Sequence, residues 1–69
     1  MSASIKVDFV IIGRDDIIVD QITHYVPLVP CIGEKLIMER YDCLVTGVTH
    51  DYTQIASGIT TIIVYTKIL

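Results

Sequence analysis

The sequence predicts an all-β protein, built as a small, five-stranded, strongly bent barrel without a substantial helix. Of the 69 residues, 28 are β-branched (13 Ile, 8 Val and 7 Thr), and such side chains favour extended backbone because they are stiff at χ1. They lie in runs that place apolar side chains on both faces of a strand, above all in residues 5–12 and 60–65. No window carries good helix formers at the i, i+3, i+4, i+7 spacing of an amphipathic helix.

Five strand candidates follow one another along the chain, separated by turn residues. They cover residues 4–12, 17–26, 34–39, 42–52 and 59–69. Residues 13–16 (Gly-Arg-Asp-Asp) predict a tight hairpin in which Gly13 is free to adopt positive φ. A second reversal is expected at Arg40-Tyr41, and the last loop at residues 53–58.

Residues 27–33 are expected to form an extended connector, because Pro27 and Pro30 cannot donate to a strand ladder. We expect the connector to pack Leu28, Val29 and Ile32 against the barrel. Five short strands with one long connector between the second and third favour a Src-homology-3-like barrel. An oligonucleotide-binding-fold barrel is the second choice, since it usually carries a helix between its third and fourth strands.

Two glycines are expected to have backbone roles. Gly33 ends the connector, where positive φ is expected, and Gly47 lies inside the fourth strand, where it predicts a bulge or sharp bend. At Gly47 a Cβ is expected to press on a neighbour. Substitution of Gly33 or of Gly47 by Ala should therefore destabilise the fold by about 1 kcal/mol or more.

Length and charge restrict the class of protein. The chain predicts a single domain over residues 1–69, with a net charge of −3 and its five basic residues scattered singly. Bulk nucleic-acid binding needs a clustered basic surface and is not expected. The longest apolar runs, such as residues 9–12, are far below the ~20 residues of a membrane-spanning helix. Lys6 and Asp8 interrupt residues 1–12, so no secretory leader is expected.

The cysteines are expected to be reduced, small, buried apolar residues of an intracellular protein. Together with the two histidines they form a His24-x6-Cys31-x11-Cys43-x6-His50 array. Structural zinc sites usually place their ligand pairs two to five residues apart, so neither a metal nor another cofactor is expected.

Polar aromatic and basic side chains are the candidate binding residues, since they combine flat apolar surface with hydrogen-bond donors. They are His24, Tyr25, Arg40, Tyr41, His50 and Tyr52. We expect the end of the second strand, the third hairpin and the end of the fourth strand to converge on one rim. The alternative is that Tyr41 and Tyr52 complete the core while Arg40 is a solvated turn residue.

An enzyme is not expected. His50 and Asp51 are neighbours on a strand and therefore point to opposite faces, which prevents a simple acid–base pair. The sequence also has no Gly-rich phosphate loop and no nucleophile elbow.

From residue 26 onward the chain resembles a group of short proteins encoded by tailed bacteriophages and prophages. Their pattern is Val-Pro-x-x-Pro-x-x-Gly-Glu followed by a Tyr, apolar strands and Val-x-His-Asp-Tyr. The matching residues are Val26-Pro27, Pro30, Gly33-Glu34, Tyr41, Val45, Val48, His50-Asp51-Tyr52 and Val64. The resemblance implies a small barrel in the bacterial host cytoplasm that acts as an accessory factor. Such factors inhibit host defence by capping a host protein or sequestering a nucleotide signal.

Three functional hypotheses remain open from the sequence. The first is a phage-encoded binding protein, an inhibitor or nucleotide sponge, that works as a homo-oligomer. The second is a structural or assembly module of a virion. The third, an Sm-like RNA-binding ring, is disfavoured because its N-terminal helix is missing and the chain is acidic.

We predict a stable homo-oligomer. A chain of this size buries only roughly 60% of its unfolded surface, and two strands with apolar residues on both faces need covering on both. Light scattering at micromolar concentration should return a multiple of 7.7 kDa. A 7.7 kDa particle that stays soluble at high concentration would contradict this prediction.

Overall fold

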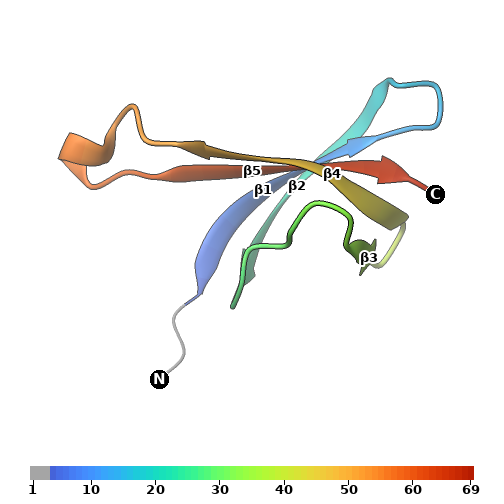
Figure 1. The fold of residues 1–69 in the computed structure, drawn as a ribbon, viewed down its shortest axis with the longest axis horizontal. Coiled ribbons are helices and arrows are strands. Elements are labelled where there is room, and N and C mark those ends of the chain that lie inside the picture. The colour runs from blue at the N-terminus through green and yellow to red at the C-terminus, as the bar shows by residue number, and fades with distance from the viewer. Residues whose placement is uncertain (1–3) are drawn as a thin grey trace.

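The computed structural model describes residues 4–69 as one strongly curled β-sheet (Figure 1). Its elements are β1 (Ile5–Ile12), β2 (Ile18–Val26), β3 (Lys35–Ile37), β4 (Asp42–Asp51), the 3-10 turn η1 (Ile55–Ser57) and β5 (Thr61–Ile68). The predicted all-β, five-stranded, strongly bent architecture is confirmed, and each strand ends within two residues of its predicted bounds.

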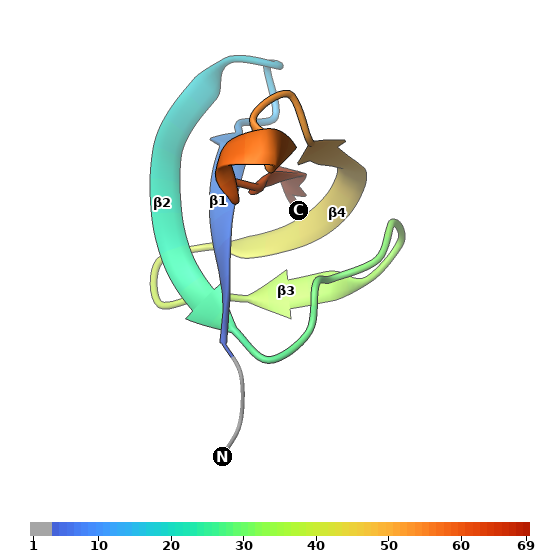
Figure 2. The same cartoon turned by 90° about the vertical axis from the view of Figure 1, so that its left-hand side faces the viewer.

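The sheet is a half-barrel that is open along one side. Its strand order is β2-β1-β5-β4-β3, with a parallel β1–β5 pair at the centre and antiparallel pairs on both sides. Figure 2 shows the sheet curling from β2 on one side to β4 on the other. Within residues 4–69, β2 and β3 are the two edges and do not pair with each other, since the proline-containing connector separates them.

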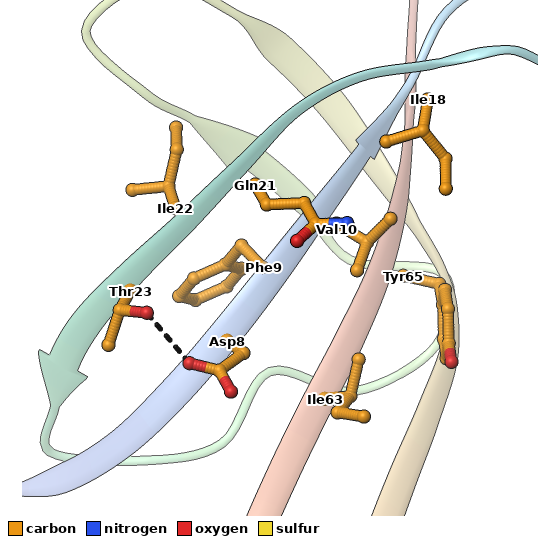
Figure 3. Close-up of a pocket in the computed structure, with 9 residues that line it drawn as sticks. All are labelled: Asp8, Phe9, Val10, Ile18, Gln21, Ile22, Thr23, Ile63 and Tyr65. Atoms are coloured by element: carbon orange, nitrogen blue, oxygen red, sulfur yellow. Dashed lines mark hydrogen bonds between the residues drawn. The ribbon is translucent and has the colours of Figure 1, made fainter.

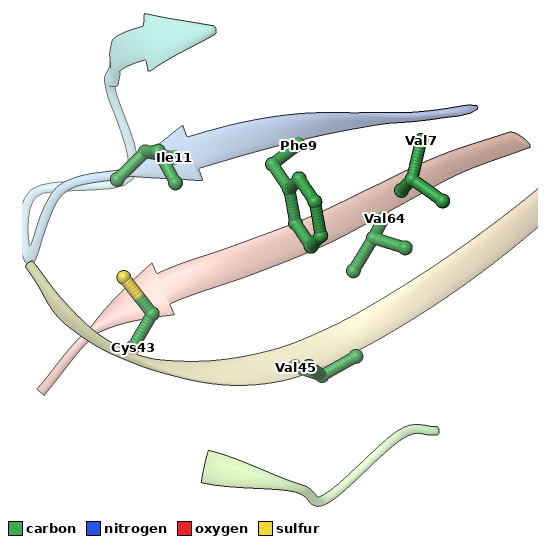
Figure 4. Close-up of a cluster of buried hydrophobic side chains, with 6 residues drawn as sticks. All are labelled: Val7, Phe9, Ile11, Cys43, Val45 and Val64. Carbon is green, nitrogen blue, oxygen red and sulfur yellow. The ribbon is translucent and has the colours of Figure 1, made fainter. Parts of the chain in front are cut away.

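The core fills the concave side of this half-barrel (Figure 4). Alternate residues of three strands point inward, as the period of two predicts. The buried apolar side chains are Val7, Phe9, Ile11, Cys43, Val45 and Val64. Thr66 is buried beside them, and its hydroxyl donates to the Val10 carbonyl at 3.0 Å. Six side chains make a small core, in keeping with the length of the chain.

A β-bulge in β4 decides which of its residues reach the core. The register against β5 shifts between Val45 and Gly47, so that Val45 and Val48 face the same side although three positions separate them. The bulge predicted at Gly47 is therefore confirmed. The expected steric conflict is wrong, because a Cβ there would lie 3.6 Å from Tyr65 Cδ2, an ordinary van der Waals contact.

The β1–β2 hairpin closes as predicted but uses its residues differently. The Asp16 amide donates to the Gly13 carbonyl at 3.0 Å, and positive φ (64°) falls on Asp16, not on Gly13. Asp tolerates this left-handed conformation because its short polar side chain bonds locally. Gly13 is needed for space instead, since a Cβ would lie 3.0 Å from Asp15 Oδ1 and 3.2 Å from Val19 Cγ1.

The hairpin is also tied to the end of β5. The Lys67 ammonium forms a salt bridge with Asp16 at 2.7 Å. The Arg14 guanidinium donates to the Leu69 carbonyl from Nη2 at 2.6 Å and from Nε at 3.2 Å. These contacts join the beginning and end of the chain outside the strand ladders.

The connector is held to β4 at its end, where Gly33 has the predicted positive φ of 92°. The Gly33 amide donates to the Val45 carbonyl, and the Val45 amide donates to the Glu34 carbonyl, both at 2.9 Å. Val29 packs against the core as expected.

Three side chains of the connector that the sequence predicts to be buried are exposed instead, so these predictions are wrong. Leu28 and Ile32 are 79% and 67% exposed, and Cys31 is exposed as well, whereas Cys43 is buried as predicted. The connector crosses the open side of the half-barrel, where no strand lies outside it to cover these residues.

Substitution of Gly33 by Ala should destabilise the protein by about 1 kcal/mol, because its φ is unfavourable for a side chain. Gly47→Ala is the matched control, since its new Cβ would make only ordinary contacts. Chemical denaturation should place Gly33→Ala clearly below Gly47→Ala. The reverse order would show that the bulge, not the connector, requires glycine.

Candidate functional site

The open side of the half-barrel contains a groove between β2 and the β3–β4 hairpin, here called the seam groove. It consists of two adjoining hollows of about 390 and 300 Å³, which share His24, Met38 and Glu39. Its apolar lining includes Phe9, Val26, Leu36 and Met38, and its charged side chains are Asp20, Lys35, Glu39 and Arg40. The groove exists because β2 and β3 do not close the barrel.

His24 lies on the concave face of β2, because it is in register with the buried Val7 of β1. Its ring approaches Phe9 edge-on, with centroids 6.2 Å apart and planes at 61°. The residue is nevertheless exposed, so it contributes both ring surface and a polar nitrogen to the groove.

Arg40 lies in the turn between β3 and β4, which is closed by a hydrogen bond from the Met38 amide to the Tyr41 carbonyl at 2.8 Å. Glu39 and Arg40 form the corner of the turn and are exposed. The expected exposure of Arg40 is confirmed, and its side chain lines the same hollow as His24.

Tyr41 spans the seam. It is half-buried against the core, and its hydroxyl donates to Asp20 Oδ2 of β2 at 3.2 Å. Loss of solvent around the ring, and then the negative charge and hydrogen bond of Asp20, raise the pKa of Tyr41 above its ordinary value of 10.0. Tyr41 therefore positions the hairpin that carries Arg40.

The other three predicted site residues lie elsewhere. Tyr25 is in register with Lys6, on the face opposite His24, and is 68% exposed. His50 and Tyr52 form a separate pair, with rings stacked at 6.0 Å and the Tyr52 hydroxyl 3.4 Å from His50 Nδ1.

The expected single rim is therefore wrong for His50, Tyr52 and Tyr25. Figure 1 shows the end of β4 and η1 at one extreme of the longest axis, away from β3. The physical reason is the length of β4, since His50 lies nine positions after Tyr41 and an extended chain covers about 30 Å over nine positions.

A separate, shallow hollow of about 500 Å³, which is not part of the seam groove, lies over β2, β1 and β5 (Figure 3). Val10, Ile18, Ile63 and Tyr65 contribute its apolar surface. Its one charged residue, Asp8, accepts a hydrogen bond from the Thr23 hydroxyl at 2.7 Å. The predicted two-sided apolar character of the central strands is visible here, but the hollow offers no cation.

A metal site built from three or more side chains is not assembled within residues 4–69. No group of three His, Cys, Asp or Glu side chains lies close enough to hold a metal ion in this range. Asp51 is occupied by Thr53, whose amide and hydroxyl donate to it at 3.0 and 2.8 Å and lower the pKa of the carboxyl.

The sequence alone did not identify Asp20, Lys35, Met38 and Glu39 as members of the groove. No local signal marks them, because their proximity depends on β2 and β3 being the two edges of one curled sheet. Only the alternation of Asp20, Ile22 and His24 along one face of β2 could have indicated that these side chains share a surface, which forms part of the seam groove.

Comparison with protein-family models, with curated proteins and with solved structures gives no match to this chain. In the part of the chain that the structure describes, no helix is long and apolar enough to cross a membrane. The fold and the seam groove are thus the observations on which a function can be based.

Asp20→Asn should lower the pKa of Tyr41, because it removes the negative charge that favours the neutral phenol. The pKa should remain above 10.0, since loss of solvent is the larger cause. The stabilising effect of the raised pKa is present below about pH 10 and is lost as pH rises through the pKa of the folded state. Ultraviolet titration against Tyr41→Phe measures the shift, and an unchanged pKa in Asp20→Asn would exclude the contact.

Proposed function

We propose that the protein is a non-enzymatic binding protein that works as a homo-oligomer and sequesters a small, planar, anionic ligand of the nucleotide class. The observation that carries the proposal is the seam groove, an apolar hollow bordered by three nitrogen donors, His24, Lys35 and Arg40.

The groove suits such a ligand in size and chemistry. Its two hollows, of about 390 and 300 Å³, fall in the range of about 300–1,000 Å³ that is common for small-molecule sites. Phe9, Leu36 and Met38 offer apolar surface to a base. Lys35 and Arg40 offer donors to a phosphate, and Arg can bind it through two parallel hydrogen bonds.

The acidic groups of the groove fit the same ligand. Glu39 lies in both hollows and Asp20 in one of them, close to the donors. Carboxylates accept hydrogen bonds from the exocyclic amino group of a base or from a ribose hydroxyl. A mixed set of donors and acceptors therefore favours a nucleotide over an inorganic anion.

The biological role that we propose is counter-defence in an infected bacterium, in which the protein removes a nucleotide signal from the host cytoplasm. This part rests on the resemblance of residues 26–64 to the phage proteins. Capping of a host defence protein through the same groove is the related alternative.

A structural role in a virion is the second candidate function. It is favoured by the exposed apolar side chains along the β2 edge, among them Ile18 at 54% and Val19 at 49% exposure. Exposed apolar side chains of this kind are expected where a subunit packs against its neighbours in a larger ring of a virion. The position of the gene separates the two, because a morphogenesis block favours structure and a group of early accessory genes favours counter-defence.

Arg40→Ala should weaken nucleotide binding without altering stability. Exposed substitutions usually change the free energy of unfolding by less than about 0.5 kcal/mol, whereas Arg often dominates binding energy. Isothermal titration with mononucleotides and cyclic dinucleotides measures affinity, and a thermal melt measures stability. Lys6→Ala is the matched control, because Lys6 is exposed but lies outside the seam groove.

The stability and the nucleotide affinity of Arg40→Ala together decide the role of this residue. Unfolding of Arg40→Ala would make the residue structural, and unchanged binding would exclude the seam groove. If no nucleotide binds the wild-type protein but a host protein co-purifies with it and is lost with Arg40→Ala, the groove caps a protein partner instead.

A further inference from the structure

The outer edge of β2 is a free strand edge over residues 20–26. Natural proteins shorten such edges or give them Lys, Pro or bulges, since free backbone groups pair with other chains. β3 follows this rule, with three residues and Lys35. In β2 the ladder with β1 is irregular at Val19, but residues 20–26 are regular and contain no Lys, Arg, Pro or Gly. Among residues 4–69, the backbone of this part bonds to β1 and, through the Gln21 amide, to Asp20 Oδ1 at 2.8 Å.

We propose that the β2 edge binds the β2 edge of a second copy of this chain, antiparallel, with the two-fold axis at Ile22. The two half-barrels then form one continuous sheet. Antiparallel pairing of residues 20–24, which lie in the regular part of β2, supplies about four to six backbone hydrogen bonds. The proposal rests on the self-association that is part of the proposed function, and it names the surface responsible.

The sequence of β2 is self-complementary in this register. Asp20 lies opposite His24 of the partner subunit, and Ile22 lies opposite its own copy, both on the concave face. On the other face, Gln21 lies opposite Thr23 of the partner subunit. These are hydrogen-bonding and apolar cross-strand pairs of the kind that stabilise sheets.

The hydrogen-bonding pair Asp20–His24 selects this register over its neighbours. A shift of the two-fold axis to Gln21 would place Asp20 opposite Ile22, and a shift to Thr23 would place it opposite Val26. Shifts by half a residue would pair the concave face with the outer face. Only the Ile22 axis brings the carboxylate to the imidazole, and it does so twice in the dimer.

The side chain of Asp20 already has two hydrogen-bond partners in the single chain. The Tyr41 hydroxyl holds Asp20 through Oδ2, which leaves Oδ1 on the side of its own strand, bonded to the Gln21 amide. Asp20 is thus fixed in place at the edge before the partner arrives.

The test mixes two variants that should each dimerise more weakly alone than the wild type. In Asp20→Lys, each new Lys faces His24 of the partner subunit, and the carboxylate that accepts the imidazole hydrogen bond is lost. In His24→Glu, each new Glu faces Asp20 of the partner subunit and is repelled. An equimolar mixture contains one Lys–Glu and one Asp–His pair, so the heterodimer should form. Asp15→Lys, in the exposed β1–β2 turn, is the charge-matched control.

Light scattering should show a dimer for the wild type and Asp15→Lys, a dimer at least tenfold weaker for each single variant, and recovery in the mixture. Dimers that persist in both single variants, or folded variants that fail to recover on mixing, would overturn the β2 pairing and leave the proposed function standing. A wild-type monomer at high concentration would overturn both.

Hydrogen exchange of the wild-type protein tests the pairing without any substitution. Amides on the free side of β2 should exchange more slowly as concentration rises, while those on the free side of β3 should not change. Concentration-independent exchange in β2 would overturn the pairing even if the variants fail to fold.

Discussion

The separation of β2 from β3 is the constraint on which the rest of the structure depends. Residues 27–34 contain Pro27 and Pro30 and cannot continue a ladder, so the chain reaches β3 without pairing it to β2. An open half-barrel results instead of a closed barrel. The seam groove, the exposed connector and the free β2 edge are all consequences of this one missing pair of strands.

The parallel β1–β5 pair at the centre explains how a chain that is 52% hydrophobic folds around so small a core. Central strands are covered laterally by neighbours and carry apolar residues on both faces. Val7 and Val64 face the core, while Val10, Ile63 and Tyr65 remain half-buried on the other face. The apolar composition therefore serves a two-faced sheet.

The proposed ligand binding and the proposed self-association both involve β2. His24 lines the seam groove and stands opposite Asp20 in the proposed dimer, while Asp20 also accepts the Tyr41 hydroxyl. A ligand in the groove and a partner at the edge would thus act on the same few side chains. In this arrangement the strength of the dimer and the affinity for the ligand are coupled through β2.

The sequence by itself determined what depends on local chemistry. β-branched runs placed the strands, prolines and glycines placed the turns, and Gly33 and Gly47 marked the positive φ and the bulge. The exposure of Arg40 also followed from its position in a reversal.

Only the tertiary structure decided the strand order, and with it the site. It placed His24 beside Arg40, but His50 at the far end of β4. It also left Cys31 of the connector exposed. The physical reason is that strand order, curvature and register are set by contacts between residues far apart in the chain, which no local pattern encodes.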